Sequence, residues 1–491
     1  MRPGTNVQGS TALPPLTPAT ETGTWFAIGP TATGPTTPYT CRSFAQFQKV
    51  FGPRISSINF AATFYDSIEA FFLRGGSEVV ILRFQGATAK AASIALKDSA
   101  SAETMEVKAS GSGTTQNGWK VIVGGAEGAF TIQVVNAAGE VLESSPVFAT
   151  KAEAVAYFKA SPYVIVKEAG ASTKSPAAGT FSLATGTDEA PTASKPNVEA
   201  QVALLPEELG PGQVSIPGIT ATEAIEGLYT AAAKAFATGV KRVAVADAPL
   251  LASKSTLATL GGVLKGLTAA VRQRGATYAD WQQLPALQGA FGVRAVPCSP
   301  FVAACCAVND SKEGHANQAP AGRWGILSPV SVGREAVNWT AKEVEELAEA
   351  GINVTRVALD GSIRIAGFRT SAPFTTEPLY YQFNNARIDM AVEWKASAVA
   401  EDYFGSDIDG QGKDAGDFKS DLAAMLLPLY DKGALFGETA SDAFTVDTGS
   451  DINTPQTEEE GDLLAVIGLC RAKGAEMVGI NITRVSMTQG V

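Results

Sequence analysis

An aromatic helix that runs directly into a buried strand sets the fold class of this chain. Between residues 60 and 72, large apolar side chains recur every three or four positions, as on one face of a helix: Phe60, Phe64, Ile68, Phe71 and Phe72. Gly75 and Gly76 end this helix, and residues 78–84 (EVVILRF) contain four consecutive apolar residues and a terminal Phe, which is typical of a strand covered on both faces. Because the glycine pair closes a helix and does not open one, it is not a phosphate-binding loop. The stretch predicts one helix-to-strand unit of an α/β layer.

The alternation of helix and buried strand resumes after a long interruption in the sequence. Residues 220–237 are helical in pattern, and residues 241–246 (KRVAVA) form a second buried strand. A helix over 255–274, a strand near 292–297 and a helix over 341–350 continue the alternation. Residues 355–359 and 362–366 flank Asp360-Gly361, a dipeptide favoured in two-residue hairpin turns. In the interruption, short alternating segments between Gly, Asn and Ser turns indicate a β-rich module with one helix near 151–159.

The C-terminal part has another pattern. A helix with a buried face is predicted from Phe418 onward, with Gly433 as a left-handed cap. An acidic loop and a second helix after Asp462 follow, and Val478, Ile480 and Ile482 alternate with polar residues as in a strand. Residues before Trp25 are rich in Pro, Thr and Gly, so they are either an extended docked arm or a disordered tail.

The sequence therefore predicts an α/β and α+β multidomain protein. It comprises an α/β core domain, an inserted β-rich domain and a C-terminal α+β domain that bears a terminal strand. The predicted division is an arm at 1–24, a discontinuous α/β domain at 25–86 plus 201–379, the insertion at 87–200, which would face outward, and the C-terminal inner assembly domain at 380–491.

Charge and composition exclude several classes of protein. The 491 residues have a net charge of −11, whereas a nucleic-acid binder needs clustered Lys and Arg for phosphate contacts. No apolar run is long enough to cross a bilayer, and the first residues lack the order of a signal peptide, so we expect a soluble protein made in the cytosol, with no membrane insertion. The five cysteines have no metal-ligand spacing and are interpreted as buried thiols: Cys41, Cys298, Cys305, Cys306 and Cys470.

The sequence gives little support for a catalytic site or a metal site. His315 is the only histidine, with Asp310 and Glu313 nearby, but no Ser or Cys has the context of a nucleophile and no nucleotide-binding loop is present. Asp407, Asp409 and Asp414 resemble part of a calcium loop but lack its closing Glu, so an acidic surface loop is favoured. Asp247 follows a predicted strand and is interpreted as a cap for the next turn. No catalytic, cofactor or metal site is predicted.

Taken in order, the motifs resemble the tail sheath protein of contractile bacteriophages and related contractile injection machines. Near the N-terminus the resemblance rests on Pro3-Gly4 and on residues 26–35 (FAIGPTATGP), 44–52 (FAQFQKVFG) and 71–83 (FFLRGGSEVVILR). In the middle it rests on residues 210–218 (GPGQVSIPG), 241–249 (KRVAVADAP), 301–325, 347–353 (LAEAGIN) and 365–370 (IAGFRT). The C-terminal stretches 429–437 (LYDKGALFG), 443–446 and 475–482 complete the resemblance. Many sheath proteins carry an Arg-Arg pair where this chain has only Arg387, so contacts of that pair are not carried over.

The resemblance implies a subunit that polymerises helically around an inner tube and contracts to drive the tube through a bacterial envelope. Expected partners are other copies of the chain, the inner tube, and baseplate and tail terminator proteins, in a virion tail assembled in the host cytoplasm, with no cofactor. A strand at a chain end can bind a neighbour by strand addition, so Val478, Ile480, Ile482, Pro3 and Val7 are predicted to exchange between subunits. Arg471 and Lys473 are predicted to contact the tube. Two alternatives stay open: the sheath of a tailocin or secretion-type system, and an α/β hydrolase-like enzyme that uses His315.

Overall fold

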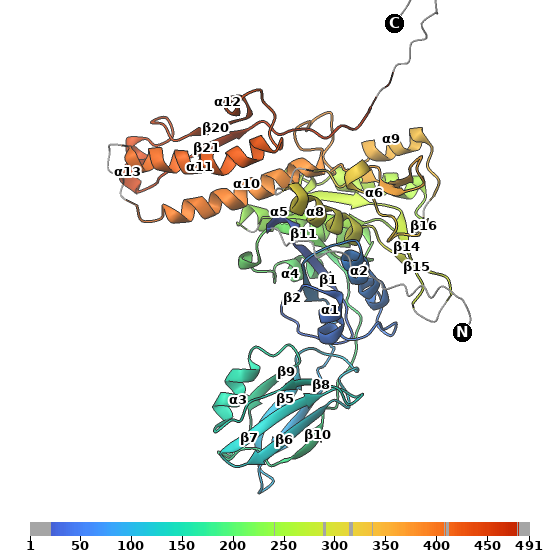
Figure 1. Ribbon diagram of the computed structural model, residues 1–491, viewed down its shortest axis with the longest axis vertical. Coiled ribbons are helices and arrows are strands. Elements are labelled where there is room, and N and C mark those ends of the chain that lie inside the picture. Colours follow the sequence, from blue (N-terminus) through green and yellow to red (C-terminus); the bar gives the residue numbers. More distant parts are fainter. Residues whose placement is uncertain are drawn as a thin grey trace, which may run out of the picture.

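The protein is built around a twisted, mostly parallel sheet, seen at the centre of Figure 1. The computed structural model describes residues 21–239, 241–287, 291–313, 318–335, 337–406, 408, 412–478 and 480. Within these residues the sheet has seven strands, in the order β17 (Ile352–Asn353), β13 (Gly275–Tyr278), β12 (Arg242–Asp247), β11 (Gly212–Ser215), β1 (Trp25–Gly29), β3 (Val79–Arg83) and β2 (Tyr39–Cys41). Neighbouring strands are parallel except β2, which runs antiparallel to β3 at the edge.

Helices cover both faces of this sheet, because its strands are apolar on both sides. Phe26 and Ile28 of β1 pack in a cluster with α5 (Thr222–Ala237) and α6 (Lys254–Lys265), whereas Trp25 and Ala27 pack against α1 (Phe44–Phe51) and α2 (Ala61–Leu73). Successive side chains of a strand point to opposite faces, which gives this division. Further elements in these layers are α4 (Lys195–Val202), α7 (Ala269–Arg272), α8 (Ser299–Glu313) and α9 (Ala341–Glu349).

Most predicted elements of the α/β part are confirmed. Ser43 caps α1 by accepting a hydrogen bond from the Gln46 amide, and α2 leads through Gly75 to β3. The predicted hairpin is formed by β18 (Thr355–Val357) and β19 (Ile363–Ile365), but its loop spans the three residues 359–361 and is not the predicted two-residue turn. The single helix expected over 255–274 is wrong: α6 ends at Gly266 and Thr268 takes an extended conformation before α7 begins. A small sheet of β14 (Trp281–Pro285), β15 (Val293–Val296) and β16 (Gly333–Glu335) completes this part.

Two further sheets form the interruption, at the lower end of Figure 1. One contains β4 (Ser93–Lys97), β5 (Glu103–Ala109) and β9 (Val164–Glu168). The other contains β10 (Gly179–Ser182), β6 (Lys120–Ala126), β7 (Ala129–Val135) and β8 (Val141–Ser144). Their inner faces and α3 (Lys151–Phe158) share one buried apolar cluster. Residues 195–202, placed by prediction at the end of this module, form α4, whose Val198 and Val202 pack in the cluster of the central sheet instead.

The C-terminal part consists of two long helices and a hairpin, drawn in orange and red in Figure 1. The helices are α10 (Phe383–Asp402) and α11 (Lys413–Asp431); the hairpin pairs β20 (Phe444–Asp447) with β21 (Val466–Leu469). Short helices α12 (Ala440–Ala443) and α13 (Pro455–Glu460) precede the two strands. The predicted apolar face of α11 is confirmed, with Phe418, Leu422, Leu426 and Leu429 buried, and Gly433 has a φ of 75° just after the helix.

The second helix, predicted after Asp462, is wrong. Leu463, Ala465, Ile467 and Leu469 pack against the α10–α11 cluster, and this spacing of two belongs to a strand. Of the predicted terminal strand, Val478 and Ile480 are described and lie in no strand, and Ile482 lies outside the described residues, as do Pro3 and Val7 of the arm. No helix within the described residues is long and apolar enough to cross a membrane.

Candidate assembly surfaces

The side chains considered for catalysis are either outside the described residues or held in internal contacts. His315 and the side chain of Glu313 are not described. Asp310, on α8, is fully buried and pairs with the Arg387 guanidinium of α10, which is also fully buried. Burial raises the pKa of the Asp310 carboxyl, and Arg387 and the Thr22 hydroxyl act in the opposite direction. Asp310 is therefore a structural charge and does not face a cleft.

This ion pair also holds the start of the described chain. Thr22, in the short helix η1 (Glu21–Gly23), donates its hydroxyl to Asp310 at 2.6 Å, and its carbonyl accepts a hydrogen bond from Gln213 at 2.8 Å. The first described residues are thus fixed beside α8 and α10. From the sequence, Arg387 is notable only as the single arginine where many sheath proteins carry a pair, and its partner 77 residues away was not predicted.

The prediction that Asp247 caps the next turn is wrong, because its carboxylate caps a helix distant in sequence. Its carboxylate accepts hydrogen bonds from the Ser299 amide at 2.7 Å and from the Ser299 hydroxyl at 2.6 Å, at the start of α8. Burial raises its pKa to about 6, although these hydrogen bonds and the helix N-terminus favour the ionised form. Asp247 is only 2% exposed.

A metal site finds no support in the described part of the chain. Asp407 and Asp409 are not described, and Asp414 lies in the first turn of α11. No group of three or more His, Cys, Asp or Glu side chains there could hold a metal ion. Cys41, Cys298, Cys305 and Cys306 are buried free thiols, whereas Cys470, expected to be buried, is exposed next to the hairpin.

Along β20 and β21 themselves the outer strand edges of the hairpin have no partner strand among the described residues, whereas the chain just beyond β21 pairs with residues 434–436. Its two strands pair with each other over four residues, and no other described strand joins the sheet. One face packs on α11, while Val466 and Leu464 on the other side are exposed. An isolated two-stranded hairpin is only marginally stable, and free edges are templates for another strand. The hairpin is therefore a candidate for strand addition by another chain.

Val478 and Ile480 lie beyond this hairpin and contribute to no core. Each side chain is 80% exposed, and Met477 beside them is 86% exposed. Consecutive exposed apolar residues near a chain end are unfavourable in a lone monomer and become favourable when a partner covers them. The geometry supplies no partner for them within the described chain.

Arg471 and Lys473 differ in how far their charges are engaged. The Arg471 guanidinium pairs with Asp389 of α10, donates to the Leu379 carbonyl and lies over the Tyr380 ring, with its side chain 9% exposed. Lys473 forms no ion pair with a described residue and lies 5.8 Å from the centre of the Tyr381 ring. Both line a pocket of about 600 Å³ between the hairpin and the start of α10, together with the exposed Phe436 and Leu379.

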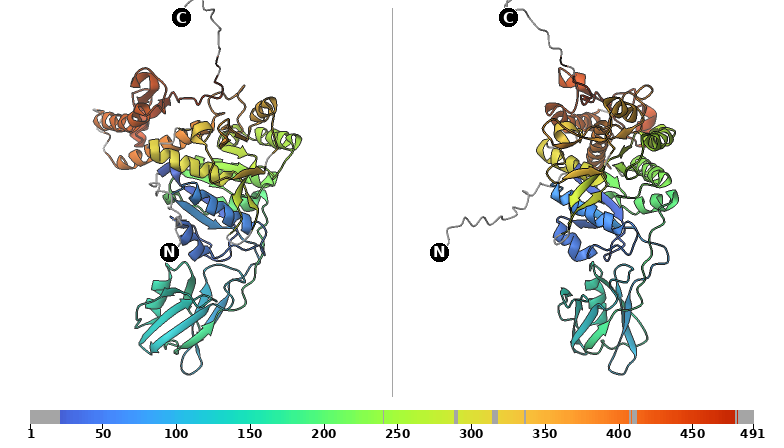
Figure 2. Two further views of the ribbon diagram at one scale, coloured as in Figure 1. Left: turned by 45° about the vertical axis from the view of Figure 1, so that its right-hand side comes forward. Right: turned by 90° about the vertical axis from the view of Figure 1, so that its right-hand side faces the viewer.

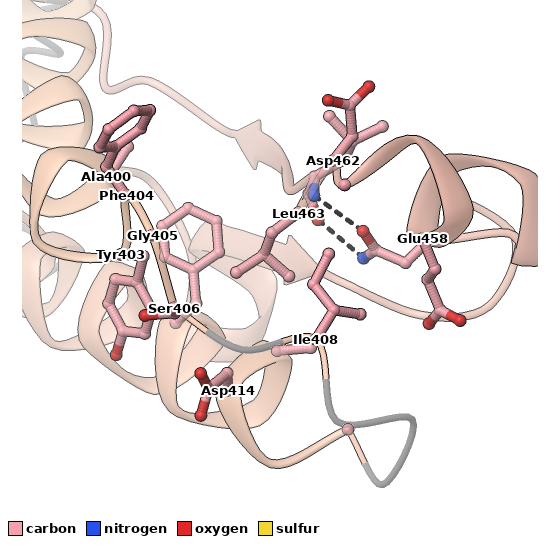
Figure 3. Close-up of a pocket in the computed structure, with 16 residues that line it drawn as sticks. Ala400, Tyr403, Phe404, Gly405, Ser406, Ile408, Asp414, Glu458, Asp462 and Leu463 are labelled. Carbon is pink, nitrogen blue, oxygen red and sulfur yellow. Dashed lines mark hydrogen bonds between the residues drawn. The ribbon is translucent and has the colours of Figure 1, made fainter.

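A second pocket lies at the opposite end of the C-terminal helices. Figure 3 shows it between the last turn of α10, the start of α11 and the segment after α13. Tyr403, Phe418 and Leu463 supply its aromatic and apolar floor, and Asp414, Glu458 and Asp462 also line it. Its volume is about 480 Å³. Asn453 fixes the floor by two hydrogen bonds to the backbone of Leu464.

Comparison with solved structures identifies the fold. A chain in the baseplate of the anti-feeding prophage superposes with a TM-score of 0.59 at 14% identity, covering 99% of each chain. The sheath tail protein of Listeria innocua gives 0.59 at 16% identity, over 89% of this chain and 90% of that one. The sheath complex of an extracellular contractile injection system, in its contracted state, gives 0.57 at 13% identity, over 100% and 99%. No protein-family model matches the sequence, and no curated protein does.

The likeness extends over nearly the whole length of each chain, insertion and C-terminal helices included. Identities of 13–16% are too low for a sequence search to detect, so the order of the motifs carried the resemblance and the arrangement of elements confirms it. This chain has the fold of the tail sheath proteins of contractile injection systems.

Proposed function

We propose that the protein is the structural subunit of a contractile sheath, which polymerises helically around an inner tube. The observation that carries this proposal is the sheath fold over the full chain, combined with a hairpin whose outer strand edges have no partner strand among the described residues. A fold alone does not determine function. Here the features outside the packed cores are those an assembling subunit needs: an open sheet, an anchored N-terminal segment and exposed apolar residues near the C-terminus.

Neighbouring subunits would be joined by strand exchange at the hairpin. The segment containing Val478, Ile480 and Ile482 of one copy, and the arm containing Pro3 and Val7 of another, would each pair with a free edge. Main-chain hydrogen bonds tolerate rotation of the globular bodies that they connect. Such contacts join different surfaces of two copies, so they build an open helix and not a closed ring.

Contraction would then be a change of lattice and would need no cofactor. The subunit bodies would repack while the strand links persist, and the extended lattice would store the energy that contraction releases. The tube would face the C-terminal part. Lys473 is the better candidate for a tube contact, because Arg471 is already neutralised by Asp389.

The particle would be a phage tail, with a tailocin or another headless injection system as the alternative. The solved structures that resemble this chain include a prophage-type particle and an extracellular injection system. Electron microscopy of particles from the producing cells would decide this, since a DNA-filled head on the sheathed tail is expected for a virion only.

The test of strand exchange uses the exposed residues that the monomer does not need. The double variant Val478→Asp/Ile480→Asp should remain folded and monomeric but form no striated tubes under negative stain. Met477→Asp, an equally exposed neighbour predicted to face the other way in a strand, is the matched control and should assemble. Deletion of residues 1–20 should also abolish polymerisation and leave a folded monomer. Normal sheaths from either the double variant or the truncation would contradict the proposal.

A further inference from the structure

The negative charge of this protein is concentrated in one segment. Residues 401–462 contain 16 acidic and 3 basic residues, while the rest of the chain contains 33 acidic and 35 basic residues. The whole net charge of −11 therefore resides in this segment, and the remainder of the molecule is nearly neutral. Copies of such a chain repel one another through this segment unless each segment meets positive charge in the assembly.

Part of this segment forms an acidic tip at the far end of the C-terminal helices. The acidic tip is defined here by Glu401 and Asp402 at the end of α10, Asp414 and Asp417 at the start of α11, Glu458, Glu459 and Glu460 on α13, and Asp462. None of these carboxylates forms an ion pair with a described residue, and α10 and α11 carry the tip away from the central sheet (Figure 1). Three of these residues line the pocket in Figure 3.

A basic pocket lies on the α/β body. It has a volume of about 460 Å³ and is formed where α2 ends, α8 ends and the short helix η3 (Gly322–Trp324) begins. Arg74, Lys312 and Arg323 line it, with Trp324 and Asn309. Lys312 and Arg323 are exposed, and Arg323 stacks over Trp324 at 4.9 Å from the ring centre.

The three cations of this pocket have no acidic partner in the described part of the chain. Arg74 donates through Nε to the Ile326 carbonyl, which fixes its guanidinium but leaves its charge uncompensated. Elsewhere on the body most arginines are paired, as Arg294 is with Asp66 and Glu69. Unpaired cations gathered in a pocket with an aromatic side chain are a surface prepared for a carboxylate-bearing partner.

We propose that the basic pocket of one copy receives the acidic tip of a second copy. The inference rests on the proposed sheath function and adds a contact that strand exchange does not supply. Charge complementarity identifies the acidic tip as the group that fills the basic pocket. The tip is the densest group of unpaired carboxylates in the described chain, and the pocket offers three unpaired cations. The two surfaces belong to different parts of the molecule, so the contact is head-to-tail and extends a helix. This contact would fix the angle between the globular bodies of neighbouring subunits, an angle that flexible strand links do not restrict.

Charge reversal tests the contact. Lys312→Glu/Arg323→Glu, both exposed, should leave the monomer folded and raise the critical concentration for sheath growth about tenfold, the effect of a few surface ion pairs acting together. Arg356→Glu is the matched control, since this exposed arginine on β18 also forms no ion pair with a described residue. Glu458→Lys/Glu459→Lys/Glu460→Lys should have the same effect as the pocket variant, and the combination of both should restore growth.

A zero-length carbodiimide cross-link gives a second readout. In a mixture of isotopically light and heavy copies of the full chain, Lys312 should become joined to the 455–462 peptide of the other label. Normal sheaths that lack this cross-link, and grow normally with the pocket variant, would overturn this inference alone. The cross-link without any sheaths would overturn the sheath function and keep the contact. Loss of tube binding with unchanged sheath growth would assign the pocket to the tube and overturn the inference too.

Discussion

Asp247 is buried, and its carboxylate is bound by the first residue of α8. The Ser299 amide and hydroxyl donate to the carboxylate, yet burial raises the pKa to about 6. In the unfolded chain an aspartate titrates near 3.9. The folded protein therefore binds this proton more tightly than the unfolded protein does, so protonation of Asp247 favours the fold.

The raised pKa of Asp247 sets the direction in which the free energy of unfolding changes with pH. The contribution of Asp247 to the free energy of unfolding is largest below about pH 4 and is lost as the pH rises to about 6, by about 2 to 3 kcal/mol for a shift of this size. Asp247→Asn should remove this slope. Denaturant unfolding at several pH values between 4 and 7 measures it, as a difference between wild type and variant.

A matched control distinguishes the effect of the Asp247 carboxyl from the effect of removing an exposed carboxyl. Asp431→Asn changes an exposed acid of α11 and should leave the difference curve flat. An Asp247→Asn variant with the pH dependence of the wild type would show that the carboxyl titrates normally in the folded state.

At the scale of elements, α10 connects two cores. Phe383, Ala386 and Met390 pack with the central sheet and α8, while Ile388 and Val392 pack with α11 and the hairpin. Sequence reasoning did not predict this helix, because its first half is buried on all sides and shows no single apolar face. Arg387, in that half, is paired with Asp310 of α8, and this is the fully buried ion pair among those that bind this helix to the body.

Breaking this pair should loosen the helix that carries the assembly surfaces. Arg387→Met leaves the Asp310 carboxylate buried without its partner, which costs about 3 to 5 kcal/mol of unfolding free energy. The double variant Arg387→Met/Asp310→Leu should recover most of this loss, because no charge stays buried. Guanidinium unfolding followed by circular dichroism measures both.

Another cation bound to α10 supplies the comparison. Lys241 pairs with the half-exposed Glu393 at 3.0 Å, so Lys241→Met should cost under about 1 kcal/mol. Equal losses in Arg387→Met and Lys241→Met would mean that the buried pair does not anchor the helix.

The helix predicted after Asp462 is wrong because the apolar residues of this segment fit a helix and a strand equally well. The segment is apolar at Leu463, Leu464, Val466, Ile467 and Leu469, which fits either period within so few residues. The deciding contact is β20, some twenty residues earlier, which pairs with it from Phe444 to Asp447. The segment forms a strand because β20 is available to pair with it.

On the scale of the whole molecule, the β-rich module is attached through a narrow joint. The Gly86 amide donates to the Glu189 carbonyl at 3.1 Å, so the two connecting segments meet side by side. The module has an apolar cluster of its own and lies at one end of the molecule (Figure 2). Arg83 borders the joint from the sheet side, where its guanidinium is buried and donates to the Thr31 carbonyl.

Excision of the module should leave the rest of the chain folded. In a variant with residues 88–187 replaced by two glycines, the remaining cores keep their contacts, and we expect the unfolding free energy to change by only about 1 to 2 kcal/mol. If the module faces outward, the variant should also form sheaths, which negative-stain microscopy would show. As the complementary control, residues 87–190 expressed alone should fold. Aggregation of the excised chain would contradict the predicted division into domains.

The sequence by itself determined the local and periodic features. The buried strands β3 and β12, the aromatic face of α2 and the apolar stripe of α11 follow from the spacing of side chains, and a turn that includes Asp360-Gly361 follows from its dipeptide. The order of these motifs also sufficed for the resemblance to sheath proteins. Each of these features depends on neighbours within a few residues, where spacing and propensity act directly.

Only the tertiary structure decided which distant groups meet. The pairing of Asp310 with Arg387, the cap that Asp247 provides for α8, and the basic pocket of Arg74, Lys312 and Arg323 each join segments tens to hundreds of residues apart. Periodicity in a sequence reports which face of an element is buried, and it carries no information about the element packed on that face. Burial changes the energy of each of these charges, so the pairings that govern stability and assembly become visible only in the folded molecule.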